Sequence, residues 1–298
     1  MDAFSIASAN GGSLTNGAGT TTLANIEALD GDSGNDTFTF GNTGSLASTI
    51  TGGLGTDTLT GDNDGNVFTV TTTNTGTLTG KTTSWSGVEQ LAGGTGSDVF
   101  TVDAGASLSG TTGIDGGGGT DELRGGTQTD TFSTTSTDAG TLNNGAATTY
   151  TDIDALTGGA AGDVFNVDNA VSGNLAGGGG SDTFNVNADV GGTINGNAGS
   201  DLIDVTDSVT ITGTVSGGND AVTDTLNLAD VLAVTDITVS AAGTNDGGQG
   251  SVTSTNVTLT GDFDDIDSLV ASSGSNGTLT GSTGNDDFTD RREVTVAP

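Results

Sequence analysis

One phrase returns along the chain: Gly-Gly-x-Gly-x-Asp, followed two residues after the aspartate by an apolar residue. Complete copies span residues 52–59, 93–100 and 177–184. A turn this specific, repeated at short intervals, predicts a chain built of similar stacked coils. It also places a carboxylate at the same corner of many coils. Looser copies of the phrase end at Asp36, Asp121, Asp163, Asp201 and Asp286.

The spacing of these aspartates measures the length of one coil. The shortest step, from Asp163 to Asp182, and the longest, from Asp98 to Asp121, bracket a coil of about 19–23 residues. Between the turns, apolar and polar residues alternate, which predicts strands. Glycine and β-branched residues disfavour helix throughout. The sequence therefore predicts an all-β protein, a right-handed parallel β-solenoid (β-helix or β-roll) with coils of this length.

The alternation also predicts which side chains face inward. Three phenylalanines share one phase, so we expect Phe100, Phe165 and Phe184 to stack inside the coils. The valines two residues later, Val102, Val167 and Val186, belong to the same inner face. We expect the intervening Thr101, Asn166 and Asn185 to point outward.

A longer repeat, about three coils in length, overlies the short one, as from Asp57 to Asp121 and from Asp98 to Asp163. An apolar-acidic phrase recurs within it, at residues 26–29, 88–91, 153–156 and 266–269. We expect one solenoid over residues 1–290, less regular from about 209 to 261, and a non-repeat tail over 291–298.

Both ends of the chain fall inside the repeat. Met1 begins at the phase of residue 65, and residues 284–288 begin a coil that is not completed. Two interpretations stay open: the chain is a window of a longer protein, with neighbouring repeats as partners, or its ends associate head to tail in a fibre.

The charge balance narrows the partners. The chain has 38 acidic and four basic residues, a net charge of −34. This argues against binding nucleic acid or anionic membranes, and no apolar run approaches the roughly 20 residues that span a bilayer. It favours cations and a salty extracellular or cell-surface location. High charge with 31% hydrophobic residues is also typical of disorder, but the apolar residues here keep a regular phase.

Several chemistries lack their usual residues. The chain has no cysteine and no histidine, which excludes disulfides and leaves no common general base or thiol nucleophile. Carboxylates are so frequent that no single pair stands out for glycoside hydrolysis. We therefore expect a protein that is not an enzyme.

The glycine-aspartate phrase resembles the calcium-binding nonapeptide of RTX (repeats-in-toxin) proteins, and the shortest coil form is similar to β-solenoid repeats of large bacterial surface adhesins. The resemblance implies Ca²⁺ bound at the turns between neighbouring coils. One departure is Asn66, where the pattern has an aspartate. By position, the implied ligands are Asp36, Asp57, Asp98, Asp121, Asp182, Asp201 and Asp286.

Elementary electrostatics also favours a cation at these turns. Coils lie about 4.8 Å apart, and two carboxylates at that spacing repel by about 1 kcal/mol in water and about 3.5 kcal/mol at an effective dielectric of 20. Ca²⁺ accepts about six to eight oxygen ligands, including the backbone carbonyls of a glycine turn. The alternative is that each aspartate only accepts a hydrogen bond from a nearby backbone amide.

The sequence thus predicts a structural extracellular repeat segment, either a spacer or stalk of a bacterial surface adhesin or a subunit of a self-assembling filament, stabilised by Ca²⁺. The alternative is a module that binds ice or glycans through an outward Thr/Asn ladder, which Val164 and Leu202 interrupt. We expect Trp85 and Tyr150 to pack between coils. The ladder would include Thr37, Thr39, Thr58, Thr60, Val99, Thr101, Thr183 and Asn185.

Overall fold

The structure is a computed structural model, and it describes residues 1–218, 222–229, 234–242, 248–254, 257–259, 263–271, 278–280 and 287–289. The described residues form strands, turns and bends, with no helix, and so none long and apolar enough to cross a membrane. The all-β prediction is confirmed. Asp286 and the tail 291–298 lie outside the described residues.

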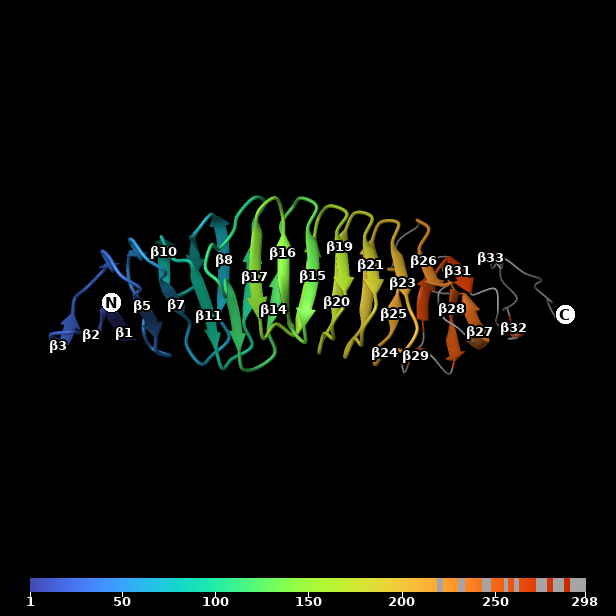
Figure 1. Cartoon of the computed structure of the whole chain (residues 1–298), viewed down its shortest axis with the longest axis horizontal. Coiled ribbons are helices and arrows are strands. Elements are labelled where there is room, and N and C mark those ends of the chain that lie inside the picture. Colours follow the sequence, from blue (N-terminus) through green and yellow to red (C-terminus); the bar gives the residue numbers. More distant parts are fainter. Residues whose placement is uncertain are drawn as a thin grey trace. The chain divides into compact units, whose positions relative to one another are not determined.

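The chain divides into two compact units, Met1–Gly126 with Ala139–Asp154, and Thr127–Asp138 with Ala155–Pro298. Figure 1 labels many of the strands of both units. The strands of the first unit are β1 (Ala3–Ser8), β2 (Gly11–Asn16), β3 (Gly19–Ala24), β4 (Leu29–Asp30), β5 (Thr37–Phe40), β6 (Thr49–Thr51), β7 (Thr58–Thr60), β8 (Val67–Thr72), β9 (Thr75–Leu78), β10 (Thr82–Ser86), β11 (Gln90–Gly94), β12 (Val99–Val102), β13 (Ile114–Gly117), β14 (Glu122–Arg124), β16 (Ala139–Asn143) and β17 (Ala147–Thr151).

The second unit continues the same strand pattern. Its strands are β15 (Thr131–Ser136), β18 (Ala155–Gly159), β19 (Val164–Val167), β20 (Leu175–Gly179), β21 (Thr183–Val186), β22 (Ile194–Ala198), β23 (Leu202–Val205), β24 (Val209–Ile211), β25 (Val215–Ser216), β26 (Thr225–Leu228), β27 (Val234–Ala242), β28 (Gly248–Ser254), β29 (Val257–Leu259), β30 (Phe263–Ile266), β31 (Ser268–Ala271), β32 (Thr278–Thr280) and β33 (Asp287–Thr289).

The strands belong to two large, mostly parallel sheets, and each regular coil contributes one strand to each sheet. In the second unit, for example, β19, β21, β23, β26 and β31 are successive parallel neighbours, which lie side by side in Figure 1. Strands β18, β20 and β22 pair in the other sheet. This arrangement is consistent with a β-solenoid.

The inner faces are filled as the alternation predicts. Phe100, Phe165 and Phe184 have 0% of their surface exposed, and the three valines two residues later have at most 1%. Because neighbouring coils are in register, equal residues stack: the ring centroids of Phe165 and Phe184 lie 4.6 Å apart, and those of Phe68 and Phe100 lie 4.9 Å apart. Trp85 and Tyr150 are also buried, as expected.

Antiparallel hairpins interrupt the parallel sheets of the first unit. They join β2 to β3, β9 to β10, and β16 to β17. Since β8, β9 and β10 lie in one sheet, the hairpin widens that sheet before the next coil begins. In the second unit, β27 and β28 form a further antiparallel pair. These hairpins account for the longer repeat that overlies the coils in the sequence.

Candidate functional site

The aspartates that end the turn phrases are buried. Each lies directly before the strand that follows the turn, so its side chain belongs to the inner face of that strand. Six of the seven predicted calcium ligands are described, and none is more than 2% exposed: Asp36, Asp57, Asp98, Asp121, Asp182 and Asp201.

Each of these carboxylates accepts a hydrogen bond from a backbone amide of the preceding coil. In the first unit, the N–H of Asp36 donates to Oδ1 of Asp57 at 2.7 Å, and that of Asp98 donates to Asp121 at 2.8 Å. In the second unit, Asp163 donates to Asp182 at 2.6 Å and Asp182 to Asp201 at 2.7 Å. We call these bonds, repeated from coil to coil within each unit, the aspartate ladder.

The apolar-acidic phrases complete this ladder after each hairpin. Oε2 of Glu89 accepts the N–H of Asp57 at 2.9 Å, and Oδ2 of Asp154 accepts that of Asp121 at 2.7 Å. The amide of each acid donates in return to the carbonyl of the same aspartate, Glu89 to Asp57 at 3.1 Å and Asp154 to Asp121 at 3.0 Å. Asp267 makes the same pair of bonds to Asp224 in the second unit. The recurring acid is therefore a second source of ladder carboxylates.

The glycine five residues before each aspartate has a steric reason. A Cβ atom at Gly52 would overlap the carbonyl oxygen of Gly87 and lie 2.7 Å from Oδ2 of Asp57, and a Cβ at Gly116 would overlap the carbonyl oxygen of Asp152 and lie 2.7 Å from Oδ2 of Asp121. The following glycine needs its backbone freedom as well, because Gly53 has a φ of 105° and Gly117 one of 89°. The turn phrase is thus the sequence that admits a buried carboxylate beside the backbone.

The second oxygens of several ladder carboxylates lack hydrogen-bond partners. Oδ2 has no hydrogen-bond partner in Asp36, Asp57, Asp98, Asp121 and Asp182. Burial raises the pKa of Asp182 to about 7, against the hydrogen bond from the amide of Asp163 and with a further rise from the charge of Asp163. Burial and the neighbouring Asp98, Asp154 and Asp115 raise the pKa of Asp121 to about 6 against the amide bond from Asp98. Burial also raises the pKa values of Asp57, Asp98 and Asp163.

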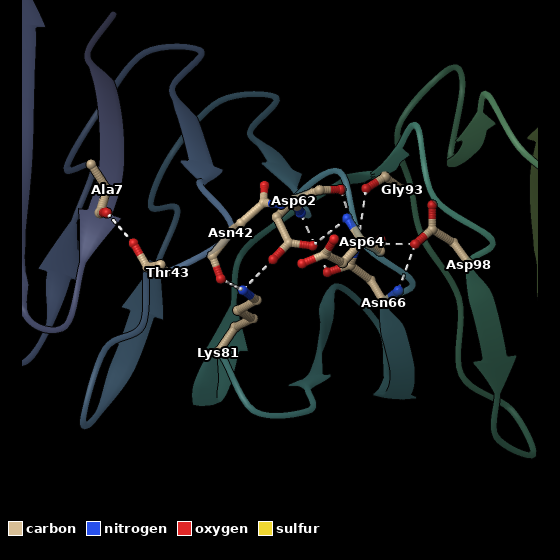
Figure 2. A network of polar contacts seen from close by, with 9 residues as sticks. All are labelled: Ala7, Asn42, Thr43, Asp62, Asp64, Asn66, Lys81, Gly93 and Asp98. Atoms are coloured by element: carbon tan, nitrogen blue, oxygen red, sulfur yellow. Dashed lines mark hydrogen bonds and ion pairs between the residues drawn. The ribbon is translucent and has the colours of Figure 1, made fainter.

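At Asn66 an amide takes the place of the carboxylate (Figure 2). Its backbone N–H still donates to Oδ1 of the next ladder aspartate, Asp98, at 2.6 Å. Its Nδ2 donates to the carbonyls of Asp62 at 3.1 Å, Asp64 at 2.8 Å and Gly93 at 3.3 Å, and to Oδ1 of Asp98 at 2.9 Å. The missing charge is therefore replaced by donated hydrogen bonds.

Beside Asn66 lies a buried ion pair. The ammonium group of Lys81 contacts a carboxylate oxygen of Asp62 and donates to the carbonyl of Asn42 at 3.0 Å (Figure 2). The side chains of Lys81 and Asp62 are 15% and 2% exposed. Although burial opposes it, hydrogen bonds and charge from Lys81, with the amide of Asp64, lower the pKa of Asp62. The single lysine of the chain thus neutralises an internal carboxylate.

The ladder aspartates supply the negative charge that a cation needs, but few side-chain ligands for it. The unpartnered Oδ2 atoms are what a cation would neutralise, and the ladder aspartates would hold it. However, the described residues contain no cluster of three or more acidic side chains suited to a metal ion. A bound Ca²⁺ would therefore need backbone carbonyls for most of its ligands. The calcium site stays a prediction.

Sequence reasoning expected these aspartates at one corner of the coils, and the structure corrects this. In the first unit, Asp36 and Asp57 precede strands of one sheet, while Asp98 and Asp121 precede strands of the other, because the hairpin between them shifts the turn to the opposite corner. Sequence reasoning also missed other members of the ladder. It did not assign Asp163, Asp224, Glu89, Asp154 or Asp267 to the site, although the recurring apolar-acidic phrase marks the last three. It also gave no role to Lys81, whose rarity in so acidic a chain was the available indication.

No protein-family model matches the chain, and no curated protein is detectably similar to it. The proposals below rest on the geometry of the chain itself.

Proposed function

We propose that the chain is a structural segment of a bacterial surface protein, a right-handed β-solenoid that acts outside the cell as a spacer, stalk or fibre subunit. The aspartate ladder is the observation that carries this. Inside each unit, the buried carboxylates bond one coil to the next. Outer side chains do the same, because Nδ2 of Asn185 donates to Oδ1 of Asn166 at 2.9 Å.

A mechanical role predicts resistance to force, because stretching the chain must break ladder bonds and strand pairs together. Single-molecule pulling between the two ends of the chain measures this. We expect distinct force peaks, lowered by Asp182→Ala, which removes the acceptor for the amide of Asp163. An extension without force peaks would contradict a mechanical role.

We propose further that Ca²⁺ stabilises the folded chain by neutralising the aspartate ladder. The support is the set of buried, unpartnered Oδ2 atoms and their raised pKa values. A proton performs the same neutralisation, so the two should compete. We expect Ca²⁺ to raise the melting temperature at about pH 8 relative to EDTA, and to have little effect at about pH 5. An equal melting temperature with Ca²⁺ and with EDTA at pH 8 would refute the role of calcium, but not the hydrogen bonds of the aspartate ladder.

Ice or glycan binding is the second candidate, and one observation favours it. The register places Thr37 beside Thr58 and Thr39 beside Thr60, so four outward threonines lie on neighbouring strands. In the second unit, Val164 and Leu202 lie on either side of Thr183. Thermal hysteresis of a freezing solution tests this, and its absence would exclude ice as the ligand.

A further inference from the structure

Three segments of the first unit are equivalent in sequence and in backbone. Residues 23–27, 85–89 and 150–154 each begin with a large apolar residue on the last strand of a hairpin and end with an acid. The third position has a left-handed backbone in all three, with φ of 58° at Asn25, 60° at Gly87 and 51° at Asp152. We call these the first, second and third hairpin ends.

A parallel strand from the preceding coil covers the second and third hairpin ends. Strand β6 pairs with β10 and places Ile50 beside Trp85, while β13 pairs with β17 and places Ile114 beside Tyr150. As a result, Trp85 is 0% and Tyr150 is 1% exposed. Val88 and Ile153, three residues further on, are 0% exposed.

The acid of each covered hairpin end then binds the turn that follows the covering strand. Glu89 accepts the N–H of Asp57 and donates its own N–H to the carbonyl of Asp57, and Asp154 does the same with Asp121. A covered hairpin end therefore consists of a parallel strand pair, a buried aromatic residue and a two-bond contact from the acid to the incoming turn.

The first hairpin end has residues of the same kinds, but no described strand covers it. Within the described part of the chain, β3 pairs only with β2. Leu23 has the position that Trp85 and Tyr150 have in the other two hairpin ends, but no parallel strand lies beside it. Leu23 and Ile26 are partly exposed and Glu27 is exposed. A small apolar hollow beneath them is lined by Phe4, Ile6, Leu23, Ile26, Leu29 and Leu46. The first hairpin end therefore offers a strand edge and a partly exposed apolar surface on which one more coil could pack.

The chain itself contains a matching coil at the other end of its sequence. Thr278-Leu279-Thr280 of β32 corresponds to Thr49-Ile50-Thr51 of β6, and residues 287–289 of β33 correspond to residues 58–60 of β7. Both correspondences have the same offset in the sequence, so residues 278–289 match residues 49–60 as one stretch of sequence. Among the described residues, β32 pairs with β27 and β33 with β31, each on one side.

We propose that β3 and the first hairpin end bind the β32–β33 coil of a second copy of this chain. Strand β32 of the second copy adds to β3 in parallel, with Leu279 at the register position opposite Leu23. This interface deepens the structural role proposed above and rests on it. It joins two different surfaces, so it continues head to tail.

Charge makes the association dependent on salt. Each copy carries a net charge of −34, so copies repel one another at low ionic strength. We expect oligomers in sedimentation velocity to grow with protein concentration and with added salt. An unmodified chain that stays monomeric in high salt at high concentration would overturn the proposal.

Two variants, each blocking one surface, test which surfaces meet. We expect Leu23→Lys and Leu279→Lys each to weaken association about tenfold or more, because a charged group replaces the apolar residue of the strand pair. Mixed together, they should form dimers and no larger species, since each retains one functional surface. Leu54→Lys is the matched control, because Leu54 is 76% exposed, pairs with Ser33 and belongs to neither surface.

The outcomes separate this interface from the structural role. If both variants and the unmodified chain melt at equal temperatures, but the mixture of variants stays monomeric, the proposed pairing is wrong. The force peaks expected of a spacer are measured on single molecules, so they do not depend on this result. Loss of the force peaks would count against the structural role itself.

Discussion

The coil at Asp182 in the second unit and the coil at Asn66 in the first hold equivalent turns by different chemistry. Asp182 is a buried carboxylate with one unpartnered oxygen and a pKa of about 7. Asn66 fills the same place with an uncharged amide that donates to three backbone carbonyls and to Asp98. The turn therefore needs a polar group of this size with hydrogen bonds to the backbone, and it does not need a charge.

Burying a carboxylate charge therefore costs a different amount of free energy in the two coils. Near Asn66 the one buried carboxylate with a charged partner, Asp62, is neutralised by Lys81 and its pKa is lowered. Along the ladder of the second unit, the described residues place no lysine or arginine beside Asp163 or Asp182, and burial raises both pKa values. The regular coils are thus the part that a proton or a cation should stabilise.

The largest expected effect is the dependence of stability on pH. Asp182 and Asp121 have pKa values of about 7 and about 6 in the folded chain and 3.8 ordinarily, so folding takes up protons. Their contribution is fully present below pH 3.8 and is lost as the pH rises through 6 and 7. For Asp182 alone, the free energy of unfolding should be about 4 kcal/mol higher in acid than at pH 8.

Denaturant titrations at several pH values without divalent cations measure this dependence. Asp182→Asn should flatten it and stabilise the chain at pH 8, because the amide at Asn66 shows that the turn accepts an uncharged group. A chain that loses stability steadily on acidification from pH 8 to pH 4 would contradict the difference between the two coils.

The ion pair beside Asn66 should respond in the opposite direction. Lys81→Met leaves Asp62 charged and buried, and we expect the free energy of unfolding to fall by about 3 kcal/mol at pH 7. The pKa of Asp62 is lowered in the folded chain, so this loss should shrink as the pH falls below 3.8. The double variant Lys81→Met with Asp62→Asn should recover most of it; no recovery would refute the assigned partnership.

In both coils a glycine five residues earlier lies close to the buried Asp or Asn side chain. Replacing such a glycine with alanine tests how much space is left there. Gly116→Ala places a Cβ atom against the carbonyl oxygen of Asp152 and 2.7 Å from Oδ2 of Asp121, and we expect thermal unfolding to show a loss of about 3 kcal/mol. Gly118→Ala is the control in the same turn, because a Cβ atom there has no neighbour within 4 Å. Similar losses in the two variants would show that the crowding at Gly116 does not select the glycine.

The smallest effect comes from converting the Asn66 coil to the common form. Asn66→Asp removes the donor to Oδ1 of Asp98 and brings a second carboxylate to that oxygen. We expect a loss of about 2 kcal/mol at pH 8 and a smaller one at pH 4, where the new carboxyl group is protonated. NMR titration should show the pKa of Asp98 rising further. Equal stability at both pH values would mean that the amide donor is not required.

The sequence predicted the inner residues well and their interactions only in part. The inward phase of Phe165 and Val167 follows from side-chain alternation, a local property, and the structure confirms it. The sequence did not predict the hydrogen bonds of Asp57, because its partners Asp36 and Glu89 lie in other coils, far from it in the sequence. Lys81 was placed beside Asp62 by the return of the β9–β10 hairpin, which no local pattern predicts.

By itself, the sequence determined the coil: glycine sets the turn, alternation sets the inner face, and the spacing of aspartates sets the length of the chain between turns. These are properties of a few consecutive residues, and so the repeated turn sequence is enough to predict them. Only the tertiary structure decided what each carboxylate does. Its acceptor role depends on which amide the preceding coil brings within about 3 Å, and its charge state depends on how completely the stacked coils exclude water.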